Sequence, residues 1–563
     1  MTFWEHFLRL LPWRPRQALA ALYWQATRRK VRARNRLREG VQNLPFAYDL
    51  WISTIESNSE LASSAGATME RWAWRPTFSV ILHSSSDYTE EQLSRSIKSI
   101  ERQIYRGWNL LVRPADLIGS AITSASGDYV VPLRIGDTLS EVALFHFAER
   151  LQNDRSAALL YGDQDELDGR GRRSRPWFKP RWNQEMFLAQ DFLGAAVAIK
   201  TNRARQVIEA GEGSVGLGLS TLLLEFTAAA DGQIAHVPHI LCHVDASIAP
   251  PSQEERLNAV ARHVQHLGAR CAPGPFGTVK VSWPLPEELP LVSVIVPTRD
   301  KAELLSACVD SLLDKTSYGP FEVLIVDNGS VEPETLNYLA RVAEHPRVRV
   351  IRDEEAYNFS AINNRAAREA SGSFLCLLNN DTEVIEPEWL SELMRYAVRP
   401  QVGAVGAKLL YDDGTIQHAG VVVGLGEAAG HAHRFAPADK PGYFGQPHAA
   451  QFVSAVTAAC LVVERAKFDA VGGLDEQDLA IAFNDVDLCL KLQAAGLRNV
   501  YVPHAVLLHH ESKSRGSDLS PGQLDRYLRE LRVLQKRWGT KGYQDPLHNP
   551  NLDPYSETYI VRL

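Results

Sequence analysis

The chain has 563 residues, and one hydrophobic core rarely serves more than about 250–300 residues, so more than one domain is expected. Hydrophobic residues make up 45% and charged residues 23%, as in ordinary soluble globular proteins. The net charge of -7 argues against a nucleic-acid-binding protein. No run of about twenty apolar residues predicts a membrane-spanning helix. The six cysteines are scattered without a Cys-x-x-Cys pair, which favours a reduced, cytoplasmic protein without a zinc cluster.

The first 40 residues differ from the rest of the chain in charge. They hold ten Lys or Arg residues against two Glu residues, interleaved with Trp, Phe and Leu side chains. This mixture is typical of an amphipathic segment that lies on an anionic membrane surface. It equally suits a helical face packed on the next domain. We therefore expect a basic amphipathic segment over residues 1–75, and a peripheral contact of residues 1–40 with the inner face of the plasma membrane is one of two interpretations.

Two stretches of the chain begin alike. Residues 78–82 (Phe-Ser-Val-Ile-Leu) and 292–296 (Val-Ser-Val-Ile-Val) each read as a buried strand that opens an α/β domain. Further on, residues 125–131 (Ala-Ser-Gly-Asp-Tyr-Val-Val) match residues 370–376 (Ala-Ser-Gly-Ser-Phe-Leu-Cys) in the same order. The matches predict an internal duplication whose first copy is shortened.

The duplication and the composition together predict five parts. Residues 253–268 have helical periodicity, and a Pro-rich stretch follows them. A helix is expected over residues 524–538, before an irregular end. The predicted parts are an N-terminal segment (1–75), a first domain (76–250), a helix and linker (251–288), a second domain (289–520) and a C-terminal helix and tail (521–563).

In the second domain, predicted strands and helices alternate. Strands are expected over residues 291–296, 321–326, 348–352 and 374–378, and helices over 303–313, 334–343, 361–370 and from 387. This alternation predicts a parallel, doubly wound sheet. Ligands of such sheets bind beyond the carboxyl ends of the strands, so the polar residues there are the candidates for a site.

Polar residues follow each of these strands. Residues 297–300 (Pro-Thr-Arg-Asp), 327–330 (Asp-Asn-Gly-Ser) and 379–382 (Asn-Asn-Asp-Thr) end three strands, and residues 358–365 (Asn-Phe-Ser-Ala-Ile-Asn-Asn-Arg) lie between the third and fourth. A carboxylate or amide can hydrogen-bond the edge of a nucleobase, and basic side chains or helix N-termini can hold phosphates. An Asp after the fourth strand can bind a divalent cation that neutralises a diphosphate.

These motifs, taken in order, resemble a family-2 glycosyltransferase with the A-type glycosyltransferase fold. The resemblance is closest to two-domain members from O-antigen and rhamnan polysaccharide clusters, and it implies two such α/β domains in tandem with a degenerate first copy. The motifs that carry it are residues 292–300, 326–330, 377–382, 472–476 (Gly-Gly-Leu-Asp-Glu), 483–490 (Phe-Asn-Asp-Val-Asp-Leu-Cys-Leu) and 503–516 (Pro-His-Ala-Val-Leu-Leu-His-His-Glu-Ser-Lys-Ser-Arg-Gly).

The resemblance implies a role for each matching residue. It assigns the nucleotide sugar to Thr298, Asp327 (on the base), Asn363, Arg365, Asn380 and Asp381. It assigns a divalent cation, Mg²⁺ or Mn²⁺, to Asp381 and His510 or, failing that, His509. It implies that Asp485, with Asp487 as the second choice, is the base that deprotonates the acceptor hydroxyl. The family pattern Asp-x-Asp is here Asn379-Asn380-Asp381, which leaves one carboxylate for the metal.

The implied reaction is inverting transfer of a sugar from a nucleoside-diphosphate donor to a glycan or lipid-linked acceptor in bacterial cell-surface polysaccharide biosynthesis. Rhamnose from a thymidine donor is one family-based option. The alternatives are an inactive glycan-binding or scaffolding protein and a nucleotidyltransferase, which would need a Gly-rich loop that residues 297–300 lack. Asp327 could instead make an Asx turn. His431 and His433 are interpreted as loop residues that line the acceptor groove.

The first copy lacks the corresponding chemistry. Without a gap, Arg134 and Gly136 stand where the carboxylates should be, and a one-residue insertion would bring Asp137 there instead. The short span over residues 96–120 predicts the loss of one strand–helix unit. The acidic run over residues 163–166 is interpreted as a loop rather than a metal cluster.

Overall fold

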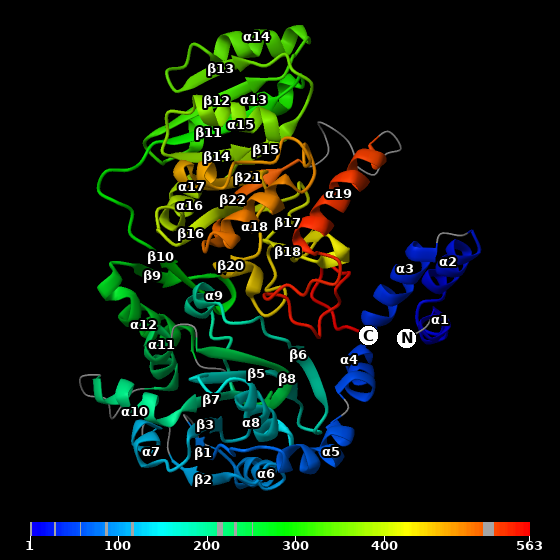
Figure 1. Cartoon of the computed structure of the whole chain (residues 1–563), viewed down its shortest axis with the longest axis vertical. Helices are drawn as coiled ribbons and strands as arrows, with labels where there is room; N and C mark the ends of the chain where they lie inside the picture. The colour runs from blue at the N-terminus through cyan, green and yellow to red at the C-terminus, as the bar shows by residue number, and fades with distance from the viewer. Residues whose placement is uncertain are drawn as a thin grey trace.

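The chain folds into two α/β domains that are stacked along the long axis of the molecule, with the first domain below the second in Figure 1. The computed structural model describes residues 3–27, 30–56, 58–84, 88–113, 118–210, 218–229, 233–249, 252–510 and 523–563. Residues 511–516, the end of the predicted histidine motif, lie outside the described residues.

The first domain is built on an eight-stranded sheet in which β2, β1, β3, β7, β5, β8 and β4 are neighbours in this order and β6 pairs with β5. The strands are β1 (Phe78–His83), β2 (Trp108–Val112), β3 (Tyr129–Arg134), β4 (Thr138–Leu139), β5 (Leu159–Leu167), β6 (Arg173–Trp177), β7 (Val197–Lys200) and β8 (Ile234–Asp245). The helices are α6 (Glu90–Glu101), α7 (Ile118–Ser124), α8 (Ala143–Asn153), α9 (Gln184–Ala189), α10 (Thr201–Ala210) and α11 (Leu219–Ala229).

The second domain has a ten-stranded sheet with the order β13, β12, β11, β14, β21, β16, β22 and β15, to which β17 and β20 are added on β16 and β22. The strands are β11 (Val292–Thr298), β12 (Phe321–Asp327), β13 (Val348–Arg352), β14 (Phe374–Leu378), β15 (Thr382–Val384), β16 (Val402–Leu410), β17 (Ile416–His418), β20 (Gln451–Val453), β21 (Cys460–Glu464) and β22 (Arg498–His509). The helices are α13 (Ala302–Lys315), α14 (Pro333–Val342), α15 (Phe359–Glu369), α16 (Trp389–Ala397), α17 (Arg465–Ala470) and α18 (Asn484–Ala494). The predicted alternation of strands and helices is confirmed.

The strand pairing confirms that the two domains are copies of one fold. The first strand of each copy, β1 or β11, runs parallel to two neighbours, β2 and β3 or β12 and β14. An antiparallel strand, β7 or β21, comes next, and β4 or β15 closes the sheet on β8 or β22. Among the described residues of the first domain, no strand corresponds to β13, as the short spacing there predicted.

The repeated Ser-Gly motif has a structural cause. In each copy a serine hydroxyl of the first strand accepts the glycine N–H, from Gly127 to Ser79 at 2.9 Å and from Gly372 to Ser293 at 2.8 Å. A Cβ atom on Gly127 would lie 2.6 Å from the backbone N of Ser79, and one on Gly372 would lie 2.7 Å from the carbonyl O of Leu291. Only glycine therefore lets the chain approach the first strand this closely.

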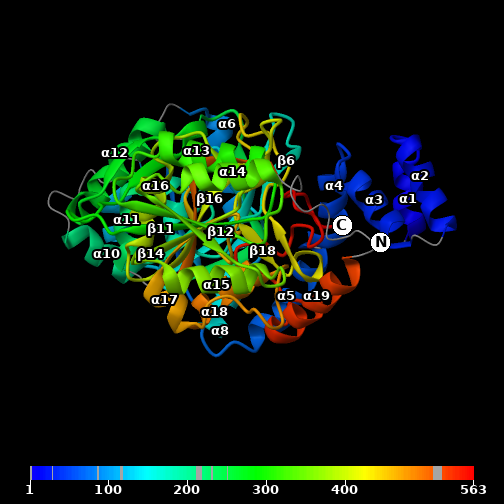
Figure 2. The same cartoon turned by 90° about the horizontal axis from the view of Figure 1, so that it is seen from above.

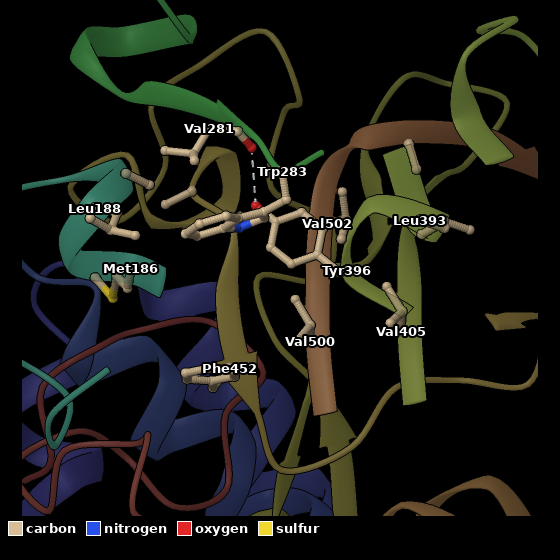
Figure 3. Packing of buried hydrophobic residues seen from close by; sticks show 14 of the residues in the cluster. Met186, Leu188, Val281, Trp283, Leu393, Tyr396, Val405, Phe452, Val500 and Val502 are labelled. Carbon is tan, nitrogen blue, oxygen red and sulfur yellow. Dashed lines mark hydrogen bonds between the residues drawn. The ribbon is translucent and has the colours of Figure 1, made fainter. Parts of the chain in front are cut away.

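One cluster of buried hydrophobic residues extends through both domains. Met186 and Leu188 of α9 in the first domain pack in the same cluster as Tyr396 of α16 and Phe452 of β20 in the second (Figure 3). Trp283 follows the hairpin of β9 (Arg270–Pro273) and β10 (Val279–Ser282). Its side chain packs in the same cluster, between α9 of the first domain and α16 of the second. This hairpin and α12 (Gln253–Val264) occupy the predicted helix and linker.

Polar contacts fix the two domains to each other. The buried side-chain amide of Asn183 pairs with the backbone of Phe452, donating to its carbonyl at 2.9 Å and accepting its N–H at 3.1 Å. The buried carboxylate of Glu185 forms an ion pair with Arg399 at 2.6 Å and accepts the indole N–H of Trp283 at 3.2 Å. These contacts bind α9 directly to the second sheet.

The C-terminal tail runs between the domains after α19 (Leu524–Trp538) (Figure 1). Asp545 accepts the N–H of Val423 in the second domain at 2.7 Å, and Asn549 donates to Asp163 of the first domain at 2.9 Å. Asp553 forms an ion pair with Arg38 of the N-terminal segment at 3.1 Å. The tail thus contacts both domains and the N-terminal segment.

The N-terminal helices α1 (Phe3–Leu10), α2 (Pro15–Ala26) and α3 (Lys30–Gln42) lie to one side of the two-domain body (Figure 2). One face of them packs in a core shared with Phe178 of the first domain and Leu552 of the tail. None of the helices within the described ranges is both long and apolar enough to cross a membrane.

The acidic run of the first domain is not a loop, and the prediction of a loop is wrong. Asp163 and Asp165 lie within β5 and are buried. Asp163 contacts His236 at 2.8 Å, and Asp165 contacts His243 and Arg173, both at 2.5 Å. Because cationic or hydrogen-bonding partners satisfy these carboxylates, they can be buried inside a sheet.

The two hydrogen bonds between Asn183 and Phe452 are expected to stabilise the domain interface. Asn183→Ala would leave the buried N–H and C=O of Phe452 without their partner, at a cost of about 2 kcal/mol or more. We expect a lower midpoint of urea unfolding and faster proteolysis between the domains. Asn153→Ala, at an exposed position of α8, is the matched control, and equal behaviour of the two variants would contradict this account of the interface.

Candidate active site

Three of the predicted site residues meet at the carboxyl ends of β11, β12 and β14. Thr298 and Asp327 are direct neighbours in the parallel register of β11 and β12. Two residues beyond β14, the Asn380 amide donates to the Thr298 hydroxyl at 3.0 Å. All three side chains are buried. The strand ends therefore meet at one edge of the sheet, as the sequence predicted.

Both carboxylate oxygens of Asp327 have partners within the protein. Oδ1 accepts the N–H of Ser330 at 2.9 Å, which is the Asx turn given as the alternative for this residue. Oδ2 forms an ion pair with Arg352 at 2.5 Å. Each carboxylate oxygen can accept more than one hydrogen bond, so the turn and a nucleoside contact are compatible.

Sequence reasoning missed Arg352. It ends β13 and lies opposite Asp327 in the parallel register of β12 and β13. The signal was present, because the strand at residues 348–352 was predicted and its last residue is an arginine beside the polar edge. Its guanidinium is partly exposed and brings a positive charge to the Asp327 end of the site.

The structure does not bring Asn363 and Arg365 to this group of residues. Asn363 is fully buried in α15, where its amide donates to the carbonyl of Phe359 at 2.8 Å. Arg365 forms an ion pair with Asp353, whose own N–H donates to the carbonyl of Asp327 at 2.9 Å. Their nucleotide contacts stay predictions.

At the end of β14, a histidine lies against the candidate metal-binding carboxylate. Nε2 of His509 lies 3.2 Å from Oδ1 of Asp381, and both side chains are buried. His510 follows β22 and donates its backbone N–H to the carbonyl of Asp381 at 2.8 Å. Its imidazole contacts Asp412 and, at 3.7 Å, Glu383. The geometry therefore favours His509, the second choice, over His510 as the partner of Asp381.

Asp485 and Asp487 both lie in the first turn of α18, but their side chains have different neighbours. Asp487 is buried between Lys491 at 3.1 Å and Arg537 at 2.8 Å, and it also accepts the Trp538 indole N–H. Its charge is thus neutralised by fixed cations. Asp485 is partly exposed and accepts the backbone N–H of Ala458 at 3.1 Å. Asp485 is the carboxylate with access to a ligand.

Two hydrogen bonds of the loop before β21 connect Asp485 with the residue that follows β14. Ala458, which binds the Asp485 carboxylate, precedes Ala459, whose carbonyl accepts the N–H of Asn379 at 3.1 Å. Asn379 lies two residues before Asp381. The loop before β21 therefore contacts both the candidate base and the residue that follows β14.

Two buried or partly buried histidines, His418 and His431, lie next to the loop that binds Asp485. Thr457 N–H donates to Nε2 of His418 at 3.3 Å, while the Nδ1 of His418 donates to the Ala407 carbonyl at 2.9 Å. Burial lowers the pKa of His418 to about 3, so its ring is neutral. Nδ1 of His431, the last residue of β19 (Ala429–His431), donates to the carbonyl of Gln417 at 2.9 Å. His431 thus lies in a strand, whereas a loop was expected.

The equivalent position of the first domain has no free carboxylate. Asp137 precedes β4 as Asp381 precedes β15, which corresponds to the predicted one-residue insertion. The guanidinium of Arg134 holds both oxygens of Asp137, at 3.0 and 3.1 Å. The positive charge occupies the place of a cation, so this copy is degenerate at the candidate metal position.

Metal ligands at the second-domain site are few. Within the described ranges, no group of three or more His, Cys, Asp or Glu side chains is arranged to hold a metal ion. Asp381 and His509 offer one carboxylate and one imidazole. Mg²⁺ is commonly held by one or two carboxylates together with substrate phosphates and water, so this small donor set fits a cation that arrives with a diphosphate.

Comparisons with known proteins agree with these features. Residues 293–421 match the model of glycosyl transferase family 2. The match includes Thr298, Asp327 and Asp381 but ends before Asp485 and His509. The assignment of the last two residues therefore depends on the geometry and on the sequence motifs alone.

Curated proteins include relatives of this chain. The uncharacterized protein y4gI of Sinorhizobium fredii is 41% identical over 448 residues, covering 77% of this chain and 49% of that protein. The O-antigen biosynthesis protein RfbC of Myxococcus xanthus is 34% identical over 556 residues, covering 90% of this chain and 42% of that protein. An N-acetylglucosaminyl-diphospho-decaprenol L-rhamnosyltransferase of Mycobacterium tuberculosis is 27% identical, covering 41% of this chain and 78% of that protein.

The chain spans about half or less of the length of the first two of these relatives. The family match includes Thr298, Asp327 and Asp381, in the domain where Asp381 lies against His509. The chain therefore carries a domain of glycosyl transferase family 2 at residues 293–421.

Proposed function

We propose that this protein is an inverting glycosyltransferase that moves a sugar from a nucleoside-diphosphate donor to a glycan or lipid-linked acceptor in bacterial cell-surface polysaccharide biosynthesis. The observation that carries the proposal is the connection of Asp485 to the strand end that bears Asp381, through Ala458 and Asn379. The names of the relatives from Myxococcus and Mycobacterium support the polysaccharide context.

Asp485 is the proposed general base. A sugar hydroxyl is a weak nucleophile near neutral pH, and removal of its proton by a positioned carboxylate accelerates attack by about 10²–10⁴-fold. The proton of the acceptor hydroxyl moves to a carboxylate oxygen of Asp485 as the hydroxyl oxygen attacks the anomeric carbon. With a single base and direct displacement, the configuration of that carbon inverts.

The donor is proposed to lie along the strand ends. Thr298, Asp327 and Arg352 are at the nucleoside end, and Asp381 and His509 would hold the divalent cation. When bound, this cation neutralises the charge that develops on the leaving diphosphate. Asn380 keeps the two ends in register through its hydrogen bond to Thr298.

The second candidate is an inactive glycan-binding or scaffolding protein of the same fold. The ion pair of Arg134 with Asp137 in the first copy favours such a role for the first domain alone. In the second domain, Asp381 lies against His509, and Asp485 accepts the backbone N–H of Ala458. We therefore assign transfer to the second domain and support to the first.

Replacement of the proposed base tests the reaction. Asp485→Asn should reduce transfer by about 10²–10⁴-fold and leave donor binding unchanged, because an amide cannot accept the proton. Transfer is measured as nucleoside-diphosphate release from UDP-, GDP- and dTDP-sugars with lipid-linked saccharides extracted from bacterial membranes. Donor binding is measured by calorimetry with UDP, GDP and dTDP.

The matched control is Asp469→Asn at an exposed position of α17, which should retain full activity. If Asp485→Asn transferred sugar as fast as the parent protein, Asp485 would not be the base. A parent protein that binds none of the three nucleoside diphosphates would instead favour the scaffolding alternative.

The two neighbouring histidines give a test of the metal site. His509→Ala should abolish the increase in nucleoside-diphosphate affinity that Mn²⁺ or Mg²⁺ produces, because the His509 ring contacts Asp381. His510→Ala should preserve most of that increase, since the His510 ring contacts Asp412 and Glu383. Calorimetry with and without the cation measures both variants, and the reverse order would restore His510 as the ligand.

We also propose a peripheral membrane contact of the N-terminal helices. Large apolar side chains are exposed on α1, on α2 and in the turn between them, beside the arginines of these helices; they are Trp4, Leu8, Trp13, Leu19 and Tyr23. Exposed aromatic and aliphatic side chains mixed with arginines suit the interface of an anionic bilayer. Such a contact would hold the enzyme near a lipid-linked acceptor.

Three substitutions test this contact without removing the helices, whose buried side chains support the tail. Trp4→Ser, Leu8→Ser and Trp13→Ser together should lower co-sedimentation with phosphatidylglycerol vesicles by about tenfold or more. The control variant carries Tyr88→Ser, Leu267→Ser and Leu336→Ser at exposed positions of the two-domain body. Equal sedimentation of the two variants would refute the membrane contact.

A further inference from the structure

An exposed aromatic side chain lies beside the candidate active site. Phe435 leaves 60% of its surface accessible to solvent, and its ring stacks on that of Tyr411 with centroids 5.4 Å apart and an angle of 8° between the planes. Arg434 holds the pair together. Its guanidinium lies 5.0 Å from the Phe435 ring centroid, and its Nε donates to the Tyr411 hydroxyl at 2.8 Å.

The backbone is strained to present this ring. Both His433 and Phe435 have positive φ angles, of 59° and 64°. Bulky residues rarely adopt this conformation, and when they do the surrounding structure must hold them there. His433 is turned inward and stacks on Tyr559 of the tail with 4.1 Å between centroids, while Phe435 is turned outward. The two strained residues thus direct an apolar ring into solvent.

The stacked pair lies on the acceptor side of the site. Tyr411 directly follows β16, and the next residue, Asp412, forms the ion pair with His510. His510 in turn binds the carbonyl of Asp381 through its N–H. The sheet order puts β16 on the opposite side of β14 from β11 and β12, which carry the nucleoside end. A nucleobase at Asp327 is therefore not the partner of this ring.

The pair is also connected to the candidate base. Glu557 of the tail accepts the backbone N–H of His431 at 3.1 Å and lies 3.7 Å from Arg434. Burial lowers the pKa of His431; the charge of Arg434 lowers this pKa further, and the charge of Asp485 raises it. His431 is therefore a shared neighbour of Arg434 and Asp485.

We propose that Phe435, supported by Tyr411 and Arg434, is a stacking platform for a pyranose ring of the acceptor saccharide. The apolar C–H face of such a ring matches the face of an aromatic side chain, and the hydroxyls at its edge remain in water or bind neighbouring polar groups. The platform orients the acceptor chain toward Asp485. This inference rests on the proposed function for the identity of the ligand.

The left-handed backbone provides a variant that separates binding from folding. Phe435→Gly removes the ring and relieves the strain, because glycine adopts positive φ without a steric cost. Its melting temperature should equal or exceed that of the parent protein. Phe435→Trp retains an aromatic face at the same position and is the conservative counterpart.

The platform is tested in the full-length protein by saturation-transfer NMR. The ligands are methyl α-L-rhamnopyranoside and methyl β-D-glucopyranoside, each at millimolar concentration. The parent protein and Phe435→Trp should transfer saturation to the ring C–H protons of at least one glycoside, and Phe435→Gly should reduce that transfer by about tenfold. Equal transfer in Phe435→Gly, or none in the parent protein, would overturn the proposal.

Nucleoside-diphosphate calorimetry keeps this test distinct from that of the proposed function. UDP, GDP and dTDP should bind Phe435→Gly as they bind the parent protein. Weaker binding of a nucleotide, with glycoside saturation unchanged, would assign the ring to the donor and reject the acceptor platform. Absence of any nucleotide binding in the parent protein would refute the proposed transfer, whereas the glycoside experiment reports on the platform alone.

Discussion

The site depends on the parallel register of β11 with β12 and β14. Thr298 and Asp327 end adjacent strands at the same level, and Asn380 reaches Thr298 because β14 ends nearby. A shift of one residue along β11 would turn its buried side chains to the opposite face of the sheet. The register is fixed on the other side by Gly372, whose close approach to the first strand admits no side chain.

The two copies keep this framework and differ in the polar residues that it carries. Ser79 and Ser293 make the same hydrogen bond to a glycine in both domains, so the framework needs this contact whatever the function. At the position before the closing strand, Asp137 is bound to Arg134, while Asp381 faces His509. The carboxylate before the closing strand thus has an arginine as its neighbour in the first copy and a histidine in the second.

The C-terminal tail joins the structural and the functional parts of the chain. Its Asn549 is buried on Asp163 of the first domain, and its Glu557 contacts His431 and Arg434 of the second. Tyr559 supplies the surface on which His433 is stacked. The conformation of the residues next to the candidate base is therefore supported from a segment far away in the sequence.

The sequence by itself determined the duplication, the alternation of strands and helices, the helix at residues 524–538 and the polar strand ends, because local periodicity and turn residues encode them. It also indicated the degenerate first copy. Only the tertiary structure placed His509 rather than His510 against Asp381, paired Asp487 with Lys491 and Arg537, and placed Arg352 on Asp327. Residues one or two positions apart fit the same sequence motif equally well. The direction of each side chain is set by neighbours from distant strands and helices.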